Sequence, residues 1–133
     1  MVIDSSALVA ILFGKPETGA FVDAIAEAEP RLMSAANLLE AAIVVDNQIG
    51  PEAGRQLDRF VEQARIEIAP VTERHARIAR QAYLDYGRGN HPAKLNFGDC
   101  FAYALAKATG EALLFKGDDF EQTDIKAYRS SGT

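Results

Sequence analysis

The order of apolar and polar positions along the chain predicts short strands that alternate with longer helices. Short apolar runs predict buried strands, namely "MVID" (1–4), "RLMS" (31–34), "IEIAPV" (66–71), "ALLFKG" (112–117) and, as a candidate last strand, "KAYR" (126–129). The stretches between these runs carry apolar residues at helical spacing. Strands that alternate with helices in this way predict an α/β sandwich around a mostly parallel sheet.

The predicted helices are bounded by residues that favour helix ends. Side chains that cap helices, prolines that suit a first turn and glycines that stop a helix all fall between the apolar stretches. These residues are Gly14, Pro16, Ser34, Gly50, Pro51, Thr72, Asn96 and Gly110. The glycines and proline of "GRGNHPAKLN" (87–96) predict a loop before the last long helix.

The stretch "NLLEAAIVV" (37–45) is unusual because Glu40 is its only charged residue. A surface helix carries a repeating polar stripe, and from Leu38 to Val45 this one shows a single polar position, so we expect a buried helix. A buried carboxylate is costly unless a cation balances it. An ion pair with Arg or Lys and a metal site both remain open for Glu40 at this point.

Composition bounds the class of protein. The 133 residues are 48% hydrophobic, which fits one domain, residues 1–133, with a substantial core. The single cysteine, Cys100, excludes an internal disulfide and a cysteine-based zinc site. No apolar run reaches the roughly 18 residues of a membrane span, so we expect a cytoplasmic protein that binds no membrane. The net charge of -5 argues against nucleic-acid binding through overall charge.

Several other carboxylates lie where strands end or helices begin. Asp4 ends the first predicted strand, Asp99 lies in the first turn of the last long helix, and Asp118 and Asp119 follow the strand at 112–117. Ligands of α/β folds bind at the carboxyl edge of the sheet, so we expect these acids and Glu40 to converge there.

Carboxylates crowded at one edge stay ionised together only beside a cation, because burial and mutual repulsion raise their pKa values. Ligand sets made only of oxygen suit Mg²⁺, with Mn²⁺ as a substitute. A metal ion held in this way can activate water for attack on a phosphodiester.

Four segments, taken together and in order, resemble the PIN-domain ribonucleases, above all the VapC-type toxins of bacterial toxin–antitoxin pairs. They are "VIDSSAL" (2–8), "SAANLLEA" (34–41), "LNFGDCFAYALA" (95–106) and "LLFKGDDFEQTDI" (113–125). The resemblance covers almost the whole chain. It implies a three-layer, PIN-like α/β/α sandwich, a Mg²⁺-dependent endoribonuclease acting on RNA, a homodimer, and a VapB-type antitoxin that blocks the site. The first two predicted helices are the candidate dimer face.

The resemblance assigns roles to individual residues. Asp4, Glu40 and Asp99 match the family's acids, and Asp4 and Asp99 are expected to hold the metal. Glu40 is expected to bind it through water or to orient the nucleophile. Ser6 matches a hydroxyl position two residues after the first acid, which we assign to substrate binding.

The fourth acid departs from the family pattern. Many members read Asp-x-Asp-Phe after the last core strand, where this chain reads Gly117, Asp118, Asp119 and Phe120. We favour Asp118 as the fourth catalytic acid, supporting a second ion, because Asp119 can cap the turn that leads to Phe120. Lys116, beside these acids, is the candidate for a phosphate contact.

A basic span precedes the Asp99 helix. Between residues 74 and 94 a single acid, Asp85, accompanies a set of basic residues: Arg74, Arg77, Arg80, Arg88 and Lys94. RNA needs such cations to offset repulsion by the acidic pocket, and the loop at 87–94 is placed to touch substrate at the rim. A solvated helix face with a flexible loop is the alternative.

Each acid also has a purely structural explanation. Asp4 can be a helix N-cap, Asp99 can complete a capping box, Glu40 can form a salt bridge, and Asp118 and Asp119 can form a solvated turn.

Two other functions compete with the nuclease. A phosphoacceptor domain would also place acids at strand ends, but it requires paired acids after the first strand and another at a central strand end, and "MVIDSS" and "IEIAPV" lack them. A catalytically silent PIN-like module that only binds RNA or a partner is left open by Gly117, while the intact Asp4, Glu40 and Asp99 count against it.

Overall fold

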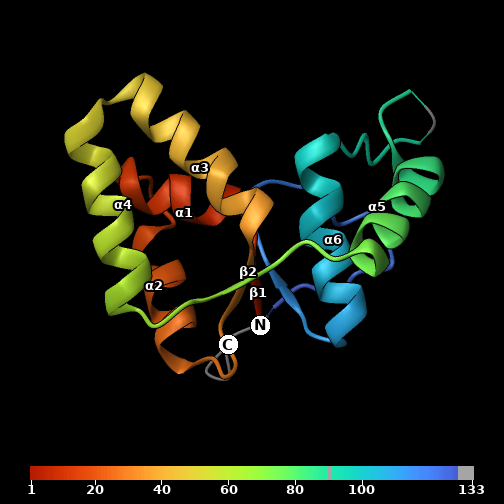
Figure 1. The fold of residues 1–133 in the computed structure, drawn as a ribbon, viewed down its shortest axis with the longest axis horizontal. Helices are drawn as coiled ribbons and strands as arrows, with labels where there is room; N and C mark the ends of the chain where they lie inside the picture. The colour runs from red at the N-terminus through yellow and green to blue at the C-terminus, as the bar shows by residue number, and fades with distance from the viewer. Residues whose placement is uncertain (90, 129–133) are drawn as a thin grey trace.

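The computed structural model, which describes residues 1–89 and 91–128, contains a parallel sheet between two layers of helices (Figure 1). The strands are β1 (Val2–Ile3), β2 (Leu32–Ser34), β3 (Glu67–Ala69) and β4 (Leu113–Leu114), in the spatial order β3-β2-β1-β4. Every pairing is parallel, which confirms the predicted sheet. The candidate strand at 126–129 contributes one bridge, from Ala127 to Leu113, and Arg129 lies outside the described residues.

Helices fill the connections between strands, as the apolar spacing predicts. They are α1 (Ser5–Leu12), α2 (Thr18–Glu27), α3 (Ala35–Gln48), α4 (Pro51–Gln63), α5 (Glu73–Tyr86) and α6 (Phe97–Thr109). The side chains of Ser34, Thr72 and Asn96 accept hydrogen bonds from backbone N–H groups two or three residues further along the chain, so the predicted caps are confirmed. No helix within the described ranges is long and apolar enough to cross a bilayer.

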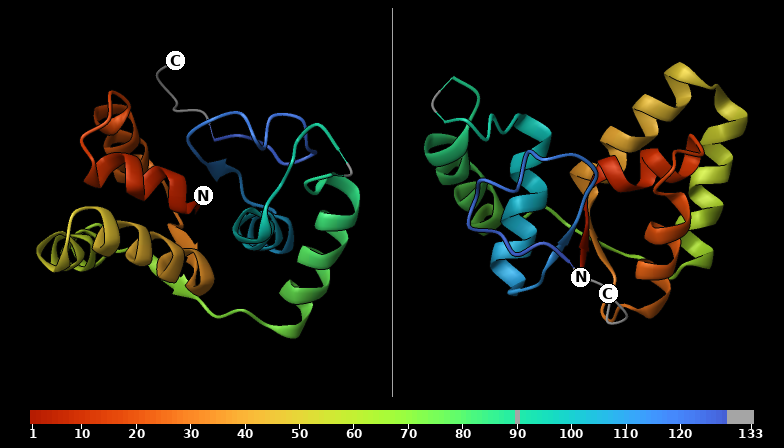
Figure 2. Two further views of the ribbon diagram at one scale, coloured as in Figure 1. Left: turned by 90° about the horizontal axis from the view of Figure 1, so that it is seen from above. Right: turned by 180° about the vertical axis from the view of Figure 1, so that it is seen from behind.

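The two faces of the sheet bury separate apolar clusters, because successive strand residues point to opposite faces. Val2 and Leu113 join the cluster formed with α5 and α6. Ile3 and Leu114 join the cluster formed with α1, α2, α3 and α4. Figure 2 shows the two groups of helices on either side of the strands, with the carboxyl ends of β1, β2 and β4 at one edge. Residues that follow these strands are therefore brought together.

The expectation that α3 is a buried helix is wrong. Asn37, Ala41 and Val45 are buried, but Leu39 and Ile43, one turn apart, are 61% and 50% exposed. A run of apolar residues predicts that the whole circumference avoids water, yet only one stripe of this helix packs against the core. The other stripe is left on the surface of the single chain, where an apolar patch is typical of a contact with another protein.

Candidate acidic site at the carboxyl ends of the strands

Asp4 is placed by the end of β1 and the start of α1. It is the N-cap of α1, and its Oδ2 accepts a hydrogen bond of 3.1 Å from the backbone N–H of Ser6. The side chain is only 2% exposed, and Oδ1 is buried without a hydrogen-bond partner among the described residues. Burial raises the pKa of Asp4 to about 6, against the lowering effect of the bonds from Ser6, and the charge of Glu40 adds to the rise.

Glu40 is held by neutral hydrogen-bond donors. The hydroxyl of Ser5 donates to Glu40 Oε1 at 2.5 Å, and the Asn37 amide donates to the same oxygen at 3.2 Å. No arginine or lysine of the described residues forms an ion pair with Glu40. Asn37 Nδ2 also donates to the carbonyl of Gly98 at 2.9 Å, which ties α3 to the first turn of α6. The salt-bridge explanation of Glu40 therefore fails.

Asp99 stabilises the start of α6 and also places a carboxylate among the other acids. Asn96 Oδ1 accepts from Asp99 N–H at 2.8 Å and Asp99 Oδ2 accepts from Asn96 N–H at 3.0 Å, which completes a capping box. Burial raises the pKa of Asp99 to about 7, although the bond from the Asn96 backbone opposes the rise. The charges of Asp4, Asp119 and Glu40 raise it further. The three predicted acids thus lie close enough to repel one another.

The chemistry of these donors fits a hydrated divalent cation. Asp4 and Asp99 are both buried, both have raised pKa values, and Asp4 keeps an orphaned oxygen. A cation would offset the charge that burial makes costly. Within the described residues no three His, Cys, Asp or Glu side chains are grouped tightly enough to hold an ion alone. Two carboxylates suffice for Mg²⁺, because this ion keeps several of its waters.

The loop after β4 brings the remaining predicted residues to the same edge. Asp118 and Asp119 are both exposed there, and Asp119 is among the charges that raise the pKa of Asp99. The backbone N–H of Lys116 donates to Ser6 Oγ at 2.9 Å. The Lys116 ammonium lies 3.2 Å from a carboxylate oxygen of Glu17, so its predicted contact with phosphate would require it to leave this ion pair.

Ser5, Asn37 and Gly98 belong to the site although sequence reasoning did not select them. Asn37 lies three residues before Glu40, a spacing that places two side chains on the same helix face, so this signal was available. Gly98 lets the Glu40 carboxylate approach the backbone of α6 closely, because an added Cβ would overlap the end of that side chain. Ser5 offered no signal beyond its position next to Asp4.

The predicted basic span is divided between a helix and a loop. Arg77 on α5 pairs with Glu73, at 3.4 Å, on an exposed face. Arg88 and Lys94, with His91, line a hollow of about 520 Å³ in the loop before α6, in which Asn90 lies outside the described residues.

Comparisons with known proteins show similarity over almost the whole chain. A family model described as PIN domain matches residues 1–126. Two relatives are 50% identical over 127 residues, spanning 95% of this chain and 96% of each relative: VapC ribonuclease Mb0625 of Mycobacterium bovis and Ribonuclease VapC28 of Mycobacterium tuberculosis. Ribonuclease VapC of Mycolicibacterium smegmatis is 48% identical over 127 residues, spanning 96% of this chain and 98% of the relative.

Solved structures share the fold at low sequence identity. The crystal structure of Mycobacterium tuberculosis VapC20, described as a sarcin-ricin loop cleaving toxin, aligns with a TM-score of 0.79 at 17% identity over 97% of this chain and 98% of that one. FitAcB from Neisseria gonorrhoeae aligns with a TM-score of 0.65 at 20% identity over 96% of both chains. These likenesses support the α/β architecture alone.

Proposed function

The chain belongs to the PIN-domain family, and from that membership and its VapC relatives we propose that it is an endoribonuclease toxin whose active site contains Asp4, Glu40 and Asp99. One observation carries the assignment of the site. A buried oxygen of Asp4 has no hydrogen-bond partner among the described residues, and it belongs to a carboxylate whose charge acts on Asp99. An unpaired buried oxygen is costly for a residue that serves only as an N-cap, whereas a bound cation would offset that cost.

The cation is the part of the chemistry that these residues do not supply themselves. We propose Mg²⁺, with Mn²⁺ as a substitute, held by Asp4 and Asp99. A bound divalent ion lowers the pKa of water and offsets phosphate charge during in-line attack. The helix caps fix both carboxylates in position before any ion arrives.

Glu40 is suited to orient the attacking water. Its hydrogen bonds from Ser5 and Asn37 both fall on Oε1, so Oε2 is left to accept a proton from water or substrate. Ser6 accepts a hydrogen bond from the Lys116 N–H through its oxygen, and its side chain also hydrogen-bonds the Asp4 carboxylate, so its proposed contact with a phosphate would compete with that bond. The fourth acid is either of two neighbours. Asp118 is the prediction from sequence, and the effect of Asp119 on Asp99 supports Asp119 as the stronger candidate.

A toxin of this kind acts with partners. We propose an RNA substrate, a VapB-type antitoxin that blocks the acidic site, and, because RNA is the substrate, action in the cytoplasm. We also propose a homodimer. The exposed stripe of Leu39 and Ile43 on α3 supports that helix as the dimer face, whereas Ala7, Leu8 and Ala10 of α1 are buried in the chain's own core.

Purified protein incubated with structured RNAs tests the nuclease function. Cleavage is expected with Mg²⁺ or Mn²⁺ and is expected to stop in EDTA, because water is not activated without the ion. Equal cleavage in EDTA would refute metal dependence. A lack of cleavage of any RNA under any condition would refute the proposed nuclease activity.

The catalytically silent module is the second candidate, and Gly117 favours it. Gly117 has φ +97°, a conformation that an aspartate rarely adopts, so the backbone itself differs from one that carries an acid here. The same experiment separates the two functions, because a silent module binds RNA in Mg²⁺ and leaves it intact.

A further inference from the structure

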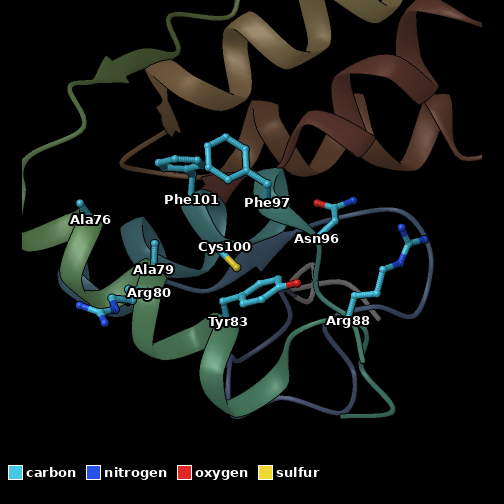
Figure 3. A pocket seen from close by; sticks show the side chains of 9 residues that line it. All are labelled: Ala76, Ala79, Arg80, Tyr83, Arg88, Asn96, Phe97, Cys100 and Phe101. Carbon is cyan, nitrogen blue, oxygen red and sulfur yellow. The ribbon is translucent and has the colours of Figure 1, made fainter. Parts of the chain in front are cut away.

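An apolar pocket of about 550 Å³ lies between α5 and α6 (Figure 3). One side comes from successive turns of α5, and the other comes from the first turns of α6. The lining residues are Ala76, Ala79, Arg80, Tyr83, Arg88, Asn96, Phe97, Cys100 and Phe101. Its size falls within the range of small-ligand sites.

Aromatic rings define the mouth of this pocket. The Phe97 side chain is 79% exposed, the most exposed of the large apolar side chains in the described part of the chain. Its ring lies at 82° to that of Phe101, with centroids 4.9 Å apart, and its high exposure leaves most of the Phe97 side chain open to a ligand. Cys100 and Ala79, two small and buried side chains, also line the pocket. A flat, apolar and uncharged ligand fits these surfaces.

Two arginines flank the pocket. In Figure 3 the side chains of Arg80 and Arg88 lie on opposite sides, with Tyr83 between them. Neither arginine forms an ion pair within the described residues. Their charges complement the phosphates on either side of one nucleotide.

Asn96 joins the pocket to the acidic site. It lines the pocket, and its backbone N–H and side-chain oxygen bond to Asp99 in the capping box. The amide Nδ2 of Asn96 takes no part in that box, so it remains a donor for a ligand. A nucleotide bound at the acids therefore has its neighbour within reach of the pocket.

We propose that this pocket receives one unpaired nucleobase of the RNA next to the scissile phosphate, stacked on Phe97, with Arg80 and Arg88 contacting the flanking phosphates. This inference rests on the proposed nuclease function. Bases splayed from single-stranded RNA stack on exposed aromatic rings in many RNA-binding proteins. An apolar side chain of an antitoxin would also fit the apolar walls, but it gives no reason for two unpaired arginines at the rim.

The first test is binding without cleavage. Short unpaired RNAs carrying 2-aminopurine at one position are titrated with the protein in EDTA at low salt. Phe97→Ala is expected to weaken binding about tenfold and to remove the 2-aminopurine signal, since one base–aromatic stack is lost. Phe97→Tyr keeps the ring face and is expected to bind as the wild type does. Leu84→Ala, at an exposed position of α5 outside the pocket, is the matched control.

The second test is a double-mutant cycle that combines a protein substitution with a change in the RNA and measures kcat/KM for cleavage. With Mg²⁺ and a mapped cut, an abasic residue is placed at each position around the cut in turn. One position is expected to lower kcat/KM about tenfold in the wild type. In the Phe97→Ala variant the same abasic residue should not lower kcat/KM any further, because the two changes remove the same interaction.

Two results would overturn the base pocket. In the first, the fold-decreases in kcat/KM caused by Phe97→Ala and by the abasic residue multiply at every position, so that the two changes act independently. In the second, Phe97→Ala binds and cleaves RNA normally but escapes inhibition by its antitoxin, which would give the pocket to a side chain of that protein. A wild-type protein that cleaves no RNA would refute the nuclease, while the binding measurement would still decide the pocket.

Discussion

Single residues in this site cap helices and carry its charge at the same time. Asp4 begins α1 and Asp99 completes the capping box of α6, and both are also the buried carboxylates that a cation would use. Their structural explanations are therefore correct but incomplete. Substitutions that keep the cap and remove the charge separate the two roles.

Asp4→Asn and Asp99→Asn are expected to lower RNA cleavage by more than about a hundredfold, since each removes a proposed metal ligand, and perturbing the hydrogen-bond partners of metal ligands alone costs about 10–100-fold. Asparagine serves as an N-cap as well as aspartate does at position 4, and its side-chain oxygen at position 99 can still accept from the Asn96 N–H, so the fold should persist. Cleavage rates and circular dichroism of each variant check this. Wild-type cleavage by either folded variant would contradict the assignment.

Asp119→Asn is expected to impair cleavage more than Asp118→Asn does, because Asp119 is the charge that acts on Asp99. Both side chains are exposed, so neither change should affect stability. Parallel measurement of kcat/KM for the two variants decides the fourth position. A larger loss in Asp118→Asn would restore the prediction made from sequence.

Gly98→Ala is expected to reduce cleavage by displacing the Glu40 carboxylate, which a new Cβ would overlap. Gly19→Ala in α2 is the matched control, since nothing lies within 4 Å of its Cβ. A glycine-to-alanine change in a helix ordinarily stabilises by about 0.4–1 kcal/mol. The control should therefore gain thermal stability and keep its activity, and equal behaviour of the two variants would show that the position of Glu40 does not matter.

For whole helices and strands, local sequence signals predict where each element begins and ends, but they do not predict which of its faces is buried. The capping residues Ser34, Thr72 and Asn96 start α3, α5 and α6 as predicted. The apolar character of α3, by contrast, comes from two stripes with different neighbours, one packed inside and one exposed. Periodicity cannot tell a core from a surface that a second protein covers.

Ile43→Asp is expected to convert the proposed dimer to a monomer, because a charge in the centre of an apolar interface is not solvated. Leu84→Asp, on an exposed face of α5, should leave the mass unchanged. Light scattering coupled to size exclusion measures both. A wild-type protein that is monomeric at all concentrations, or a dimer unaffected by Ile43→Asp, would remove α3 as the interface.

At the scale of the whole molecule, stability is linked to protons and metal through Asp4 and Asp99. Their pKa values in the folded chain, about 6 and about 7, exceed the ordinary 3.8, so the metal-free folded state binds more protons than the unfolded one between these values. The stability of the metal-free protein therefore falls as the pH rises from about 4 to about 7.

The melting temperature in EDTA is accordingly expected to drop by about 5 °C or more between pH 5 and pH 7.5. Mg²⁺ should recover part of the loss at pH 7.5 and little at pH 5, because protons compete with the ion for the carboxylates. Differential scanning fluorimetry measures both effects. Asp99→Asn should show a smaller drop, and an equal drop would assign the pH dependence to other groups.

Local patterns in the sequence were enough to predict the elements and the acids, because caps, glycine stops and apolar periods act within a few residues of one another. The sequence predicted the parallel α/β sheet and the three acids Asp4, Glu40 and Asp99 that the fold brings within electrostatic reach. Contacts between distant parts of the chain depend on strand order and helix packing, so they could be read only from the folded molecule. These contacts include the bond of Ser5 to Glu40, the bond of Asn37 to Gly98 and the pairing of Lys116 with Glu17.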